Sequence, residues 1–264
     1  MPARGCARPV LTRLRDASYV TEADLSSQAA IVAALHAAFP GLRIVGEEDG
    51  AVPAPAAPAA PAAGTPAPAP ALAGLADEAS EVPLAEVTVL VDPVDGTREL
   101  VEGRLGAVQV LVGVAVRGRA VAGAVGLPFP DGSTEAPPAL VYGLVGRGFG
   151  RIVEGREVAG PPGGAAGGSP LLYTTGDSQN AALAAAKAVL AGAASGGEVA
   201  WTKMGGAGNK LLAVAEGRVE AALMHFGTSL WDTCAPEAVV AAMGGQVSDL
   251  FGGESMQPRA GAGG

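Results

Sequence analysis

The chain has few cysteines and few histidines: Cys6, Cys234, His36 and His225 are all that its 264 residues contain. Two cysteines do not make a disulfide framework, so a reducing compartment fits best and we predict a cytoplasmic protein. The isolated histidines offer no cysteine–histidine cluster for zinc. We expect His36 on a helix surface and His225 within a strand.

Long apolar runs and an excess of positive charge are also absent. No apolar run reaches the length of a membrane span. The 17 lysines and arginines face 26 acids, and a net charge of −9 argues against binding to a nucleic-acid polymer. A small phosphorylated substrate remains compatible, because clustered carboxylates that bind divalent cations make a site positive. Several arginines precede the first acid, Asp16, which keeps a chloroplast or mitochondrial transit peptide as an alternative location.

Glycine and proline are abundant, with 40 and 21 residues, and they concentrate in particular segments. Residues 51–76 are dominated by alanine and proline and lack a packing face, so we expect a poorly ordered surface linker. The glycine-rich stretch 160–168 is a candidate boundary. We therefore divide the chain into halves at 1–168 and 169–264.

Hydrophobic periodicity predicts helices and strands in both halves. Thr21 is a plausible N-cap of a helix that ends at Pro40-Gly41. Strands are predicted in the first half at 42–45, 87–91, 108–116, 120–126, 140–145 and 148–153, several of them as hairpins. Strands at 171–175 and 221–226 then alternate with helices at 180–191, 210–216 and 231–243. This order predicts an α/β fold with an α+β first half and an α/β second half.

The stretch Asp92-Pro93-Val94-Asp95-Gly96-Thr97 directly follows the predicted buried strand at 87–91. Two carboxylates three residues apart, at a strand end and across a proline turn, can converge on one point. The glycine frees the backbone and the threonine adds a hydroxyl, a set that suits a hard cation, a phosphate and an attacking water. The alternative is a turn with solvated carboxylates.

Other acids occupy equivalent positions. Glu47, followed by Glu48, comes after the strand at 42–45, and Asp232 opens the helix at 231–243. Strand ends and helix starts cluster at one edge of an α/β sheet, where ligands usually bind. Carboxylate oxygens suit Mg²⁺, and two such ions about 3.5–4 Å apart serve phosphoryl transfer.

These residues carry a family resemblance. Gly46-Glu47-Glu48, Asp92 to Thr97 and Trp231-Asp232 resemble the three signature motifs of the inositol monophosphatase superfamily of metal-dependent, lithium-sensitive phosphatases. Within it, Val20 to Asp24, Gly205 to Lys210, and Trp231 to Glu237 look most like the 3′(2′),5′-bisphosphate nucleotidases. That branch removes the 3′-phosphate of adenosine 3′,5′-bisphosphate, and some members cleave inositol 1,4-bisphosphate. The resemblance covers residues 19–252 apart from the Ala/Pro tract, and it implies a layered αβαβα sugar-phosphatase fold.

The resemblance also implies residue roles in the metal site and the chemistry. Two or three Mg²⁺ ions would be held by Glu47, Asp92, Asp95, Asp232 and the Val94 carbonyl. Thr97 would orient the attacking water, with Asp24 as its acidic partner. The alternative for Asp24 is helix capping, and one residue can serve both purposes.

Further roles concern the substrate, which the second half is expected to bind. Gly96 and Thr97 would offer backbone amides to the reacting phosphate, beside Asp232. Lys210 matches a lysine that contacts the other phosphate, and its alternative is an ordinary surface lysine. Thr175 and Ser178 lie in the segment that binds adenosine in the branch.

Two departures from the branch stand out. Gly176 and Ser178 replace an arginine and a histidine of the adenosine segment, which puts the nucleotide substrate in more doubt than the phosphatase chemistry. Only residues 1–18 precede the Val-Thr-x-x-Asp motif, where the family has a longer helix, so we expect an exposed apolar face. The alternatives are therefore an inositol monophosphatase, or a truncated and inactive metal-binding or scaffold protein. The expected assembly is a monomer or a homodimer.

Overall fold

The computed structural model describes residues 11–13, 19–48, 50–52, 81–158, 171–177, 180–193, 198–225 and 227–249. Apart from its first two positions, the predicted linker at 51–76 lies outside the described residues. Ser178 and the stretch 160–168 also lie outside them. Among the described residues, no helix has the length and apolar character needed to cross a membrane.

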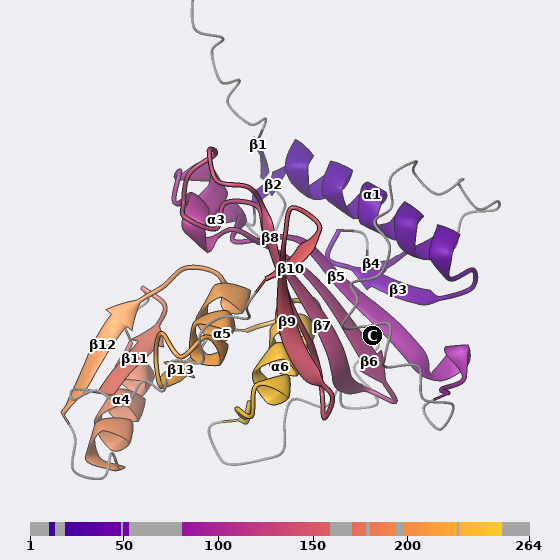
Figure 1. Ribbon diagram of the computed structural model, residues 1–264. Coiled ribbons are helices and arrows are strands. Elements are labelled where there is room, and N and C mark those ends of the chain that lie inside the picture. Colours follow the sequence, from indigo (N-terminus) through magenta and orange to yellow (C-terminus); the bar gives the residue numbers. More distant parts are fainter. Residues whose placement is uncertain are drawn as a thin grey trace, which may run out of the picture.

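The first half forms a mixed sheet of eight strands (Figure 1). Its strand order is β10-β9-β8-β7-β6-β5-β3-β4, and every neighbouring pair is antiparallel except β3 and β5. The strands are β3 (Arg43–Gly46), β4 (Gly50–Val52), β5 (Val87–Asp95), β6 (Gln109–Val116), β7 (Arg119–Leu127), β8 (Ala139–Leu144), β9 (Gly148–Val153) and β10 (Arg156–Val158). The predicted hairpins are confirmed, while β4 and β10 were not predicted.

The turn between β6 and β7 explains one of these hairpins. Arg117 and Gly118 both have positive φ angles, of 51° and 79°. Positive φ at both central residues is the backbone of a type I′ turn, whose twist matches that of the paired strands. The Arg-Gly pair therefore closes the β6–β7 hairpin, and a bulge between Val114 and Ala115 then shifts the register of the rest of the pairing.

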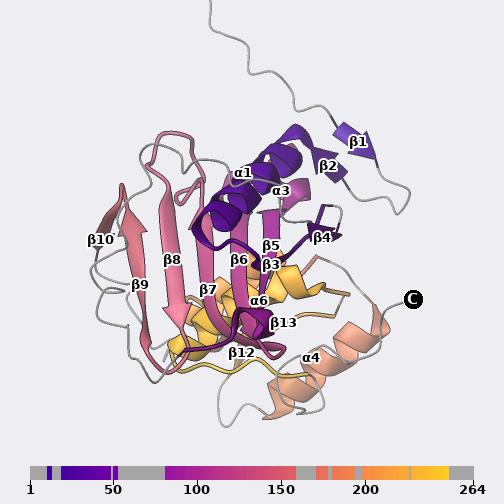
Figure 2. The same ribbon diagram turned by 90° about the vertical axis from the view of Figure 1, so that its right-hand side faces the viewer.

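Helices cover both faces of the large sheet (Figure 2). On one face, α1 (Glu22–Ala38) packs on β3 and β5 through a cluster of Val32, Leu42, Ile44, Val89 and Val91. On the other face lies α6 (Leu230–Ala242), whose Ala235 and Val239 pack against strands β6, β7 and β8. Two short hydrogen-bonded elements, β1 (Leu11–Arg13) and β2 (Tyr19–Thr21), precede α1 and were not predicted.

A row of glycines lets α6 approach the sheet closely. Gly113, Gly123 and Gly143 are cross-strand neighbours on β6, β7 and β8. A Cβ atom on Gly123 would lie 2.1 Å from the carbonyl oxygen of Ala235, and one on Gly143 would lie 2.7 Å from the Cα of Val239. Side chains at these positions would push the helix off the sheet, so the glycines set the distance between α6 and the sheet.

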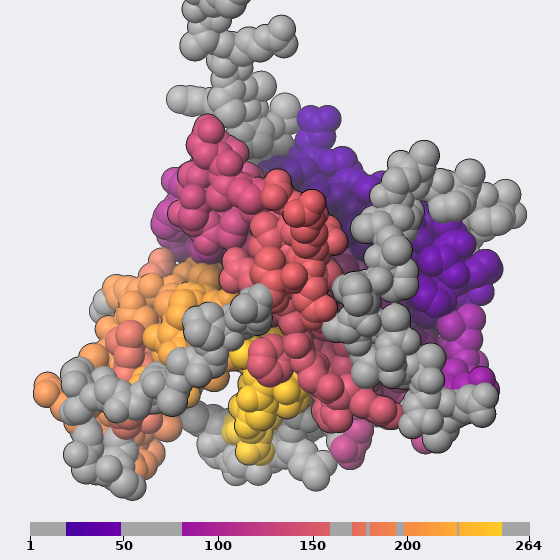
Figure 3. Space-filling model, viewed as in Figure 1, coloured from indigo at the N-terminus to yellow at the C-terminus, as the bar shows by residue number. Residues whose placement is uncertain are grey.

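The second half contains a small parallel sheet with the order β12-β11-β13. Its strands are β11 (Leu171–Thr175), β12 (Val199–Lys203) and β13 (Ala221–Leu223), and its helices are α4 (Ala181–Ala193) and α5 (Ala207–Ala215). Figure 3 shows this orange part lying against the magenta and red segments of the first half. The α/β alternation predicted for this half is confirmed, and β12 is an additional strand. Because α6 crosses onto the large sheet, the two halves are interlocked, and the division at 168 stays a prediction.

Some local predictions were wrong. His36 is buried at 3% exposure, because α1 turns Val32 and His36, four residues apart, toward the sheet. His225 follows β13, which ends at Leu223 rather than at 226. Helix α5 begins at Ala207, three residues before the predicted start at Lys210.

The apolar sheet face that we expected to be exposed has side chains of intermediate exposure, and the expectation stays a prediction. Beyond the reach of α1, side chains on β6 to β9 alternate toward the same side as the α1 cluster. Val110, Ala124, Leu140 and Ile152 represent this face, and each is half-buried rather than exposed.

Candidate active site

Three carboxylates from two distant motifs meet at one end of the large sheet. Asp92 and Asp95 close β5, and Asp232 lies in the first turn of α6. Carboxylate oxygens of the three residues lie within 4.8 Å of one another. Strand β5 and helix α6 thus bring together three of the four acids that the sequence grouped, and their role as metal ligands stays a prediction.

Asp95 is held by the second half of the chain. Its two carboxylate oxygens accept hydrogen bonds from the backbone amides of Ala207, at 3.0 Å, and Gly208, at 2.8 Å, at the start of α5. The loop that delivers these amides needs small residues: Gly206 has φ of 71°, and a Cβ on Gly208 would lie 3.0 Å from an Asp95 oxygen. The glycine-rich stretch before Lys210 therefore positions a carboxylate of the first half.

Glu47 reaches the same place from β3. Its backbone amide donates to the carbonyl of Val91 at 3.0 Å, which extends the β3–β5 pairing by one residue. Its side chain interacts with Asp92 and lines a pocket beside the cluster. Glu47 as a whole residue is exposed, unlike Asp92 and Asp95, but its carboxyl group is partly removed from water.

Gln28 fixes the backbone around Glu47 and was not identified from the sequence. Its side-chain amide donates to the carbonyl of Glu48 at 2.5 Å and accepts from the amide of Glu48 at 3.1 Å. A Cβ on Gly46 would lie 2.3 Å from the Gln28 Oε1 atom, so the glycine of the Gly-Glu-Glu motif makes room for this contact. A neutral glutamine inside a helix carries no motif signal, and only the packing of α1 on β3 reveals it.

Thr97 and Asp24 form a pair across the sheet edge. The Thr97 hydroxyl lies 3.1 Å from an Asp24 carboxylate oxygen and 3.1 Å from the carbonyl of Val94. Asp24 also accepts from the backbone amide of Thr21 at 2.7 Å and completes the capping box of α1. One Asp24 oxygen caps the helix and the other contacts Thr97, so the capping role is confirmed and the catalytic role stays a prediction that the geometry allows.

Burial raises the pKa values of the carboxyl groups in this cluster. Loss of water raises the pKa of Glu47 to about 7 and that of Asp95 to about 6, and the charge of Asp232 adds to both shifts. Desolvation, followed by the charges of Asp95 and Glu47, raises the pKa of Asp92 well above its ordinary value. Carboxylates that repel one another in this way favour a divalent cation, which offsets their charge. The donor set is made of oxygen atoms, as Mg²⁺ requires, so the residues fit this ion.

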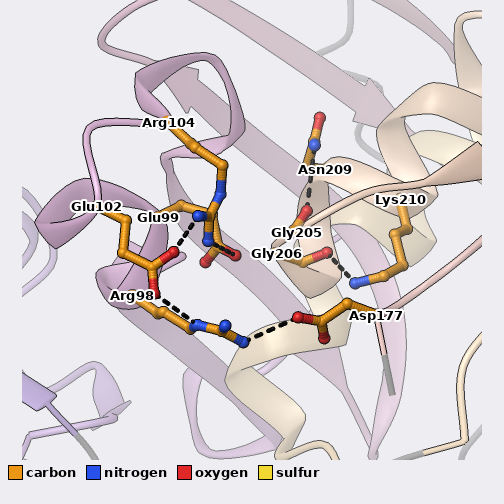
Figure 4. A network of polar contacts seen from close by, with 9 residues as sticks. All are labelled: Arg98, Glu99, Glu102, Arg104, Asp177, Gly205, Gly206, Asn209 and Lys210. Carbon is orange, nitrogen blue, oxygen red and sulfur yellow. Dashed lines mark hydrogen bonds and ion pairs between the residues drawn. The ribbon is translucent and has the colours of Figure 1, made fainter. Parts of the chain in front are cut away.

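A pocket of about 350 Å³ opens beside the cluster. It is lined by Glu47, Asp95, Gly96, Thr97, Arg98, Glu99, Gly206, Ala207, Lys210, Gly227 and Asp232. Lys210 is buried and donates to the carbonyl of Gly206 at 2.6 Å, and burial lowers the pKa of its ammonium group (Figure 4). The alternative of an ordinary surface lysine is therefore wrong. Gly96 precedes the short helix α3 (Thr97–Val101) with φ of 88°, a conformation that favours glycine.

No described residue of the predicted adenosine segment lines this pocket. Thr175 is fully buried and its hydroxyl donates to the carbonyl of Leu223 at 2.8 Å, within the small sheet. Ser178 lies outside the described residues. Asp177, which the sequence did not single out, forms an ion pair with Arg98 instead.

Comparisons with known proteins show which family the chain resembles in sequence. The family model described as the inositol monophosphatase family matches residues 11–263. The human 3′(2′),5′-bisphosphate nucleotidase 1 is 33% identical over 88% of the chain and 71% of its own length, and the Dictyostelium discoideum protein of that name is 29% identical over 89% and 75%.

Solved structures support the fold. The extragenic suppressor protein suhB from Bartonella henselae matches with a TM-score of 0.64 at 22% identity, over 93% of the chain and 79% of its own. CysQ from Bacteroides thetaiotaomicron matches with a TM-score of 0.57 at 19% identity, over 84% and 72%. The chain therefore belongs to the inositol monophosphatase family and is a metal-dependent phosphomonoesterase of that family.

Proposed function

We propose that the protein removes the 3′-phosphate of adenosine 3′,5′-bisphosphate in a Mg²⁺-dependent hydrolysis, and that inositol 1,4-bisphosphate is a second substrate. The observation that carries the proposal is the placement of the carboxylate cluster and the Thr97–Asp24 pair on one pocket that also holds cationic side chains. The similarity to bisphosphate nucleotidases supports the nucleotide substrate.

The metal ligands we propose are Glu47, Asp92, Asp95, Asp232 and the carbonyl of Val94. Bound Mg²⁺ supplies charge neutralisation for the transferring phosphoryl group and for the leaving oxygen. The amides at the start of α5 hold Asp95 in a fixed orientation, and Gln28 holds the backbone that carries Glu47. Two or three ions are compatible with this number of oxygens.

Thr97 and Asp24 act on the attacking water. When the Thr97 hydroxyl donates its proton to Asp24, its lone pairs are left to accept a hydrogen bond from a water in the pocket. The water oxygen forms the new bond to phosphorus and gives up a proton, the ester bond to the sugar oxygen breaks, and that oxygen takes up a proton, so the products are inorganic phosphate and the free hydroxyl. Asp24 is held by Thr21, so it keeps the threonine hydroxyl in one orientation.

A phosphate-release assay tests the proposal. Wild-type protein with Mg²⁺ should release phosphate from adenosine 3′,5′-bisphosphate, and Li⁺ should inhibit the reaction, as the family resemblance implies. Asp95→Asn should lose this activity while its folded circular-dichroism spectrum is kept. Full activity of Asp95→Asn would contradict the metal assignment.

An inositol monophosphatase is the second candidate. The replacement of the branch's arginine and histidine by Gly176 and Ser178 favours it. Release from inositol 1-phosphate, without release from the nucleotide, would select it. Mg²⁺ binding measured by calorimetry without turnover of any ester would instead indicate an inactive metal-binding protein.

A further inference from the structure

The rim of the active-site pocket carries an ion pair that joins the two halves of the chain. Arg98 directly follows Thr97 in α3, and Asp177 lies two residues after β11. The Arg98 Nη1 atom lies 3.1 Å from an Asp177 oxygen, and its Nε atom lies 2.9 Å from Glu102 (Figure 4). Arg98 lines the same pocket as Asp95 and Asp232, so this guanidinium group stands beside the proposed reaction site.

Lys210 brings a second cationic group to the same region. Figure 4 shows its ammonium group on the side where the Asp177 carboxylate meets Arg98. Burial lowers the pKa of Lys210, and the negative charges of Asp95, Glu99 and Asp177, in that order, counteract this shift. Asp177 is thus an anionic group placed near both cations of the pocket.

We propose that Arg98 is a specificity-determining residue that binds the second anionic group of a bisphosphate substrate, and that Asp177 occupies this position in the free enzyme as an internal competitor. The inference rests on the proposed function, because it concerns the substrate of the same site. It assigns a role to a residue next to the Asp-Pro-Val-Asp-Gly-Thr motif and to a carboxylate in the segment where this chain departs from the nucleotidase branch.

The exposure of the pair makes such an exchange favourable. The side chains of Arg98 and Asp177 are 53% and 63% exposed, and ion pairs this open to water are weak. A phosphate group carries more negative charge and can accept two parallel hydrogen bonds from a guanidinium group. A second phosphate on the substrate therefore displaces Asp177, whereas a monophosphate leaves the ion pair in place.

The competing interpretation is that the ion pair only holds the two halves together. The two interpretations predict opposite effects of Asp177→Asn on substrate binding. If the pair only held the halves together, removing either partner would impair the enzyme in the same way. If Asp177 competes with the substrate, removing its charge improves binding while removing Arg98 weakens it. The two variants therefore move KM in opposite directions.

The test compares two nucleotides that differ only in the second phosphate, adenosine 3′,5′-bisphosphate and adenosine 3′-monophosphate. Arg98→Gln should lower kcat/KM for the bisphosphate by about ten- to a hundredfold, the value of a charge-assisted contact, and leave the monophosphate nearly unchanged. Asp177→Asn should lower KM for the bisphosphate by about two- to fivefold, since an exposed ion pair is worth no more.

Arg117→Gln is the matched control, because Arg117 forms an exposed ion pair with Glu86 and neither residue lines the pocket. It should leave the bisphosphate-to-monophosphate ratio unchanged, and thermal unfolding should confirm that all variants are folded. An equal loss on both substrates in Arg98→Gln, or a raised KM in Asp177→Asn, contradicts the inference.

The same comparison with inositol 1,4-bisphosphate and inositol 1-phosphate separates this inference from the proposed function. If only the inositol esters are hydrolysed, the nucleotide assignment fails and the role of Arg98 is decided on the inositol pair. If none of the four esters releases phosphate, the proposed function itself is contradicted, and the inference with it. If they are hydrolysed and Arg98→Gln leaves the ratio unchanged, the role of Arg98 alone is overturned.

Discussion

The contact between Gln28 and Gly46 predicts a strong coupling between two residues outside the metal site. Gln28→Ala removes both hydrogen bonds to the backbone of Glu48, and leaving these groups unpaired should cost about 2–4 kcal/mol. Gly46→Ala introduces a Cβ that would lie 2.3 Å from the Gln28 amide oxygen. The glutamine side chain is flexible and can swing away cheaply, so the cost is again the loss of the same two hydrogen bonds.

Because both changes remove the same interactions, the double variant should be about as stable as Gln28→Ala alone. Chemical denaturation of the wild type, both single variants and the double variant gives the coupling free energy, which we expect to be about 2–4 kcal/mol. The Mg²⁺ concentration for half-maximal activity should rise in all three variants, since the backbone that carries Glu47 loses its support. Additive stability losses would refute the reasoning.

Three further predictions follow from the core, the acid cluster and the water site. Gly123→Ala should destabilise the protein by about 3 kcal/mol because it forces α6 off the sheet. In Gly192→Ala the added Cβ meets no atom within 4 Å, so this variant should stabilise α4 by up to about 1 kcal/mol. Thermal unfolding measures both changes. Burial raises the pKa of Asp95 to about 6, so the folded metal-free protein keeps a proton that the unfolded chain releases near pH 4. This group alone should lower the unfolding free energy by about 3 kcal/mol between pH 4 and 7, and the raised pKa values of Glu47 and Asp92 add to the fall and extend it to higher pH. Denaturation at several pH values checks this fall, and saturating Mg²⁺ should abolish it; a metal-free stability that rises over this range would contradict it. Thr97→Val should lower kcat at least about a hundredfold with little change in stability, while Thr97→Ser, which keeps the hydroxyl, should stay within about tenfold of wild type.

The sequence predicted the parts of the site that depend on local rules. A buried apolar run followed by a proline turn placed Asp92 and Asp95 at a strand end, and a helix start placed Asp232 nearby. The capping box of α1 was visible in Thr21 and Asp24. These features need only a few neighbouring residues, so their signals survive in a single sequence.

The remaining features depend on contacts between distant segments. The hydrogen bonds of the Gln28 side chain to the Glu48 backbone join residues 20 apart in the sequence, and the Arg98–Asp177 ion pair joins residues 79 apart. The passage of α6 across Gly123 on the large sheet is likewise a matter of packing, and it makes the predicted halves interlock. His36 was misplaced for the same reason, since the buried side of α1 is set by the sheet beneath it.

The central claim is that the carboxylate cluster supports metal-dependent hydrolysis of a phosphate ester. The most direct measurement is phosphate release from adenosine 3′,5′-bisphosphate by wild type and Asp95→Asn, with Mg²⁺ and after its removal by a chelator. We expect release by the wild type that stops with the chelator and returns with added Mg²⁺, and no release by the variant at any Mg²⁺ concentration. Release that persists in the chelator, or equal rates for wild type and variant, would contradict it.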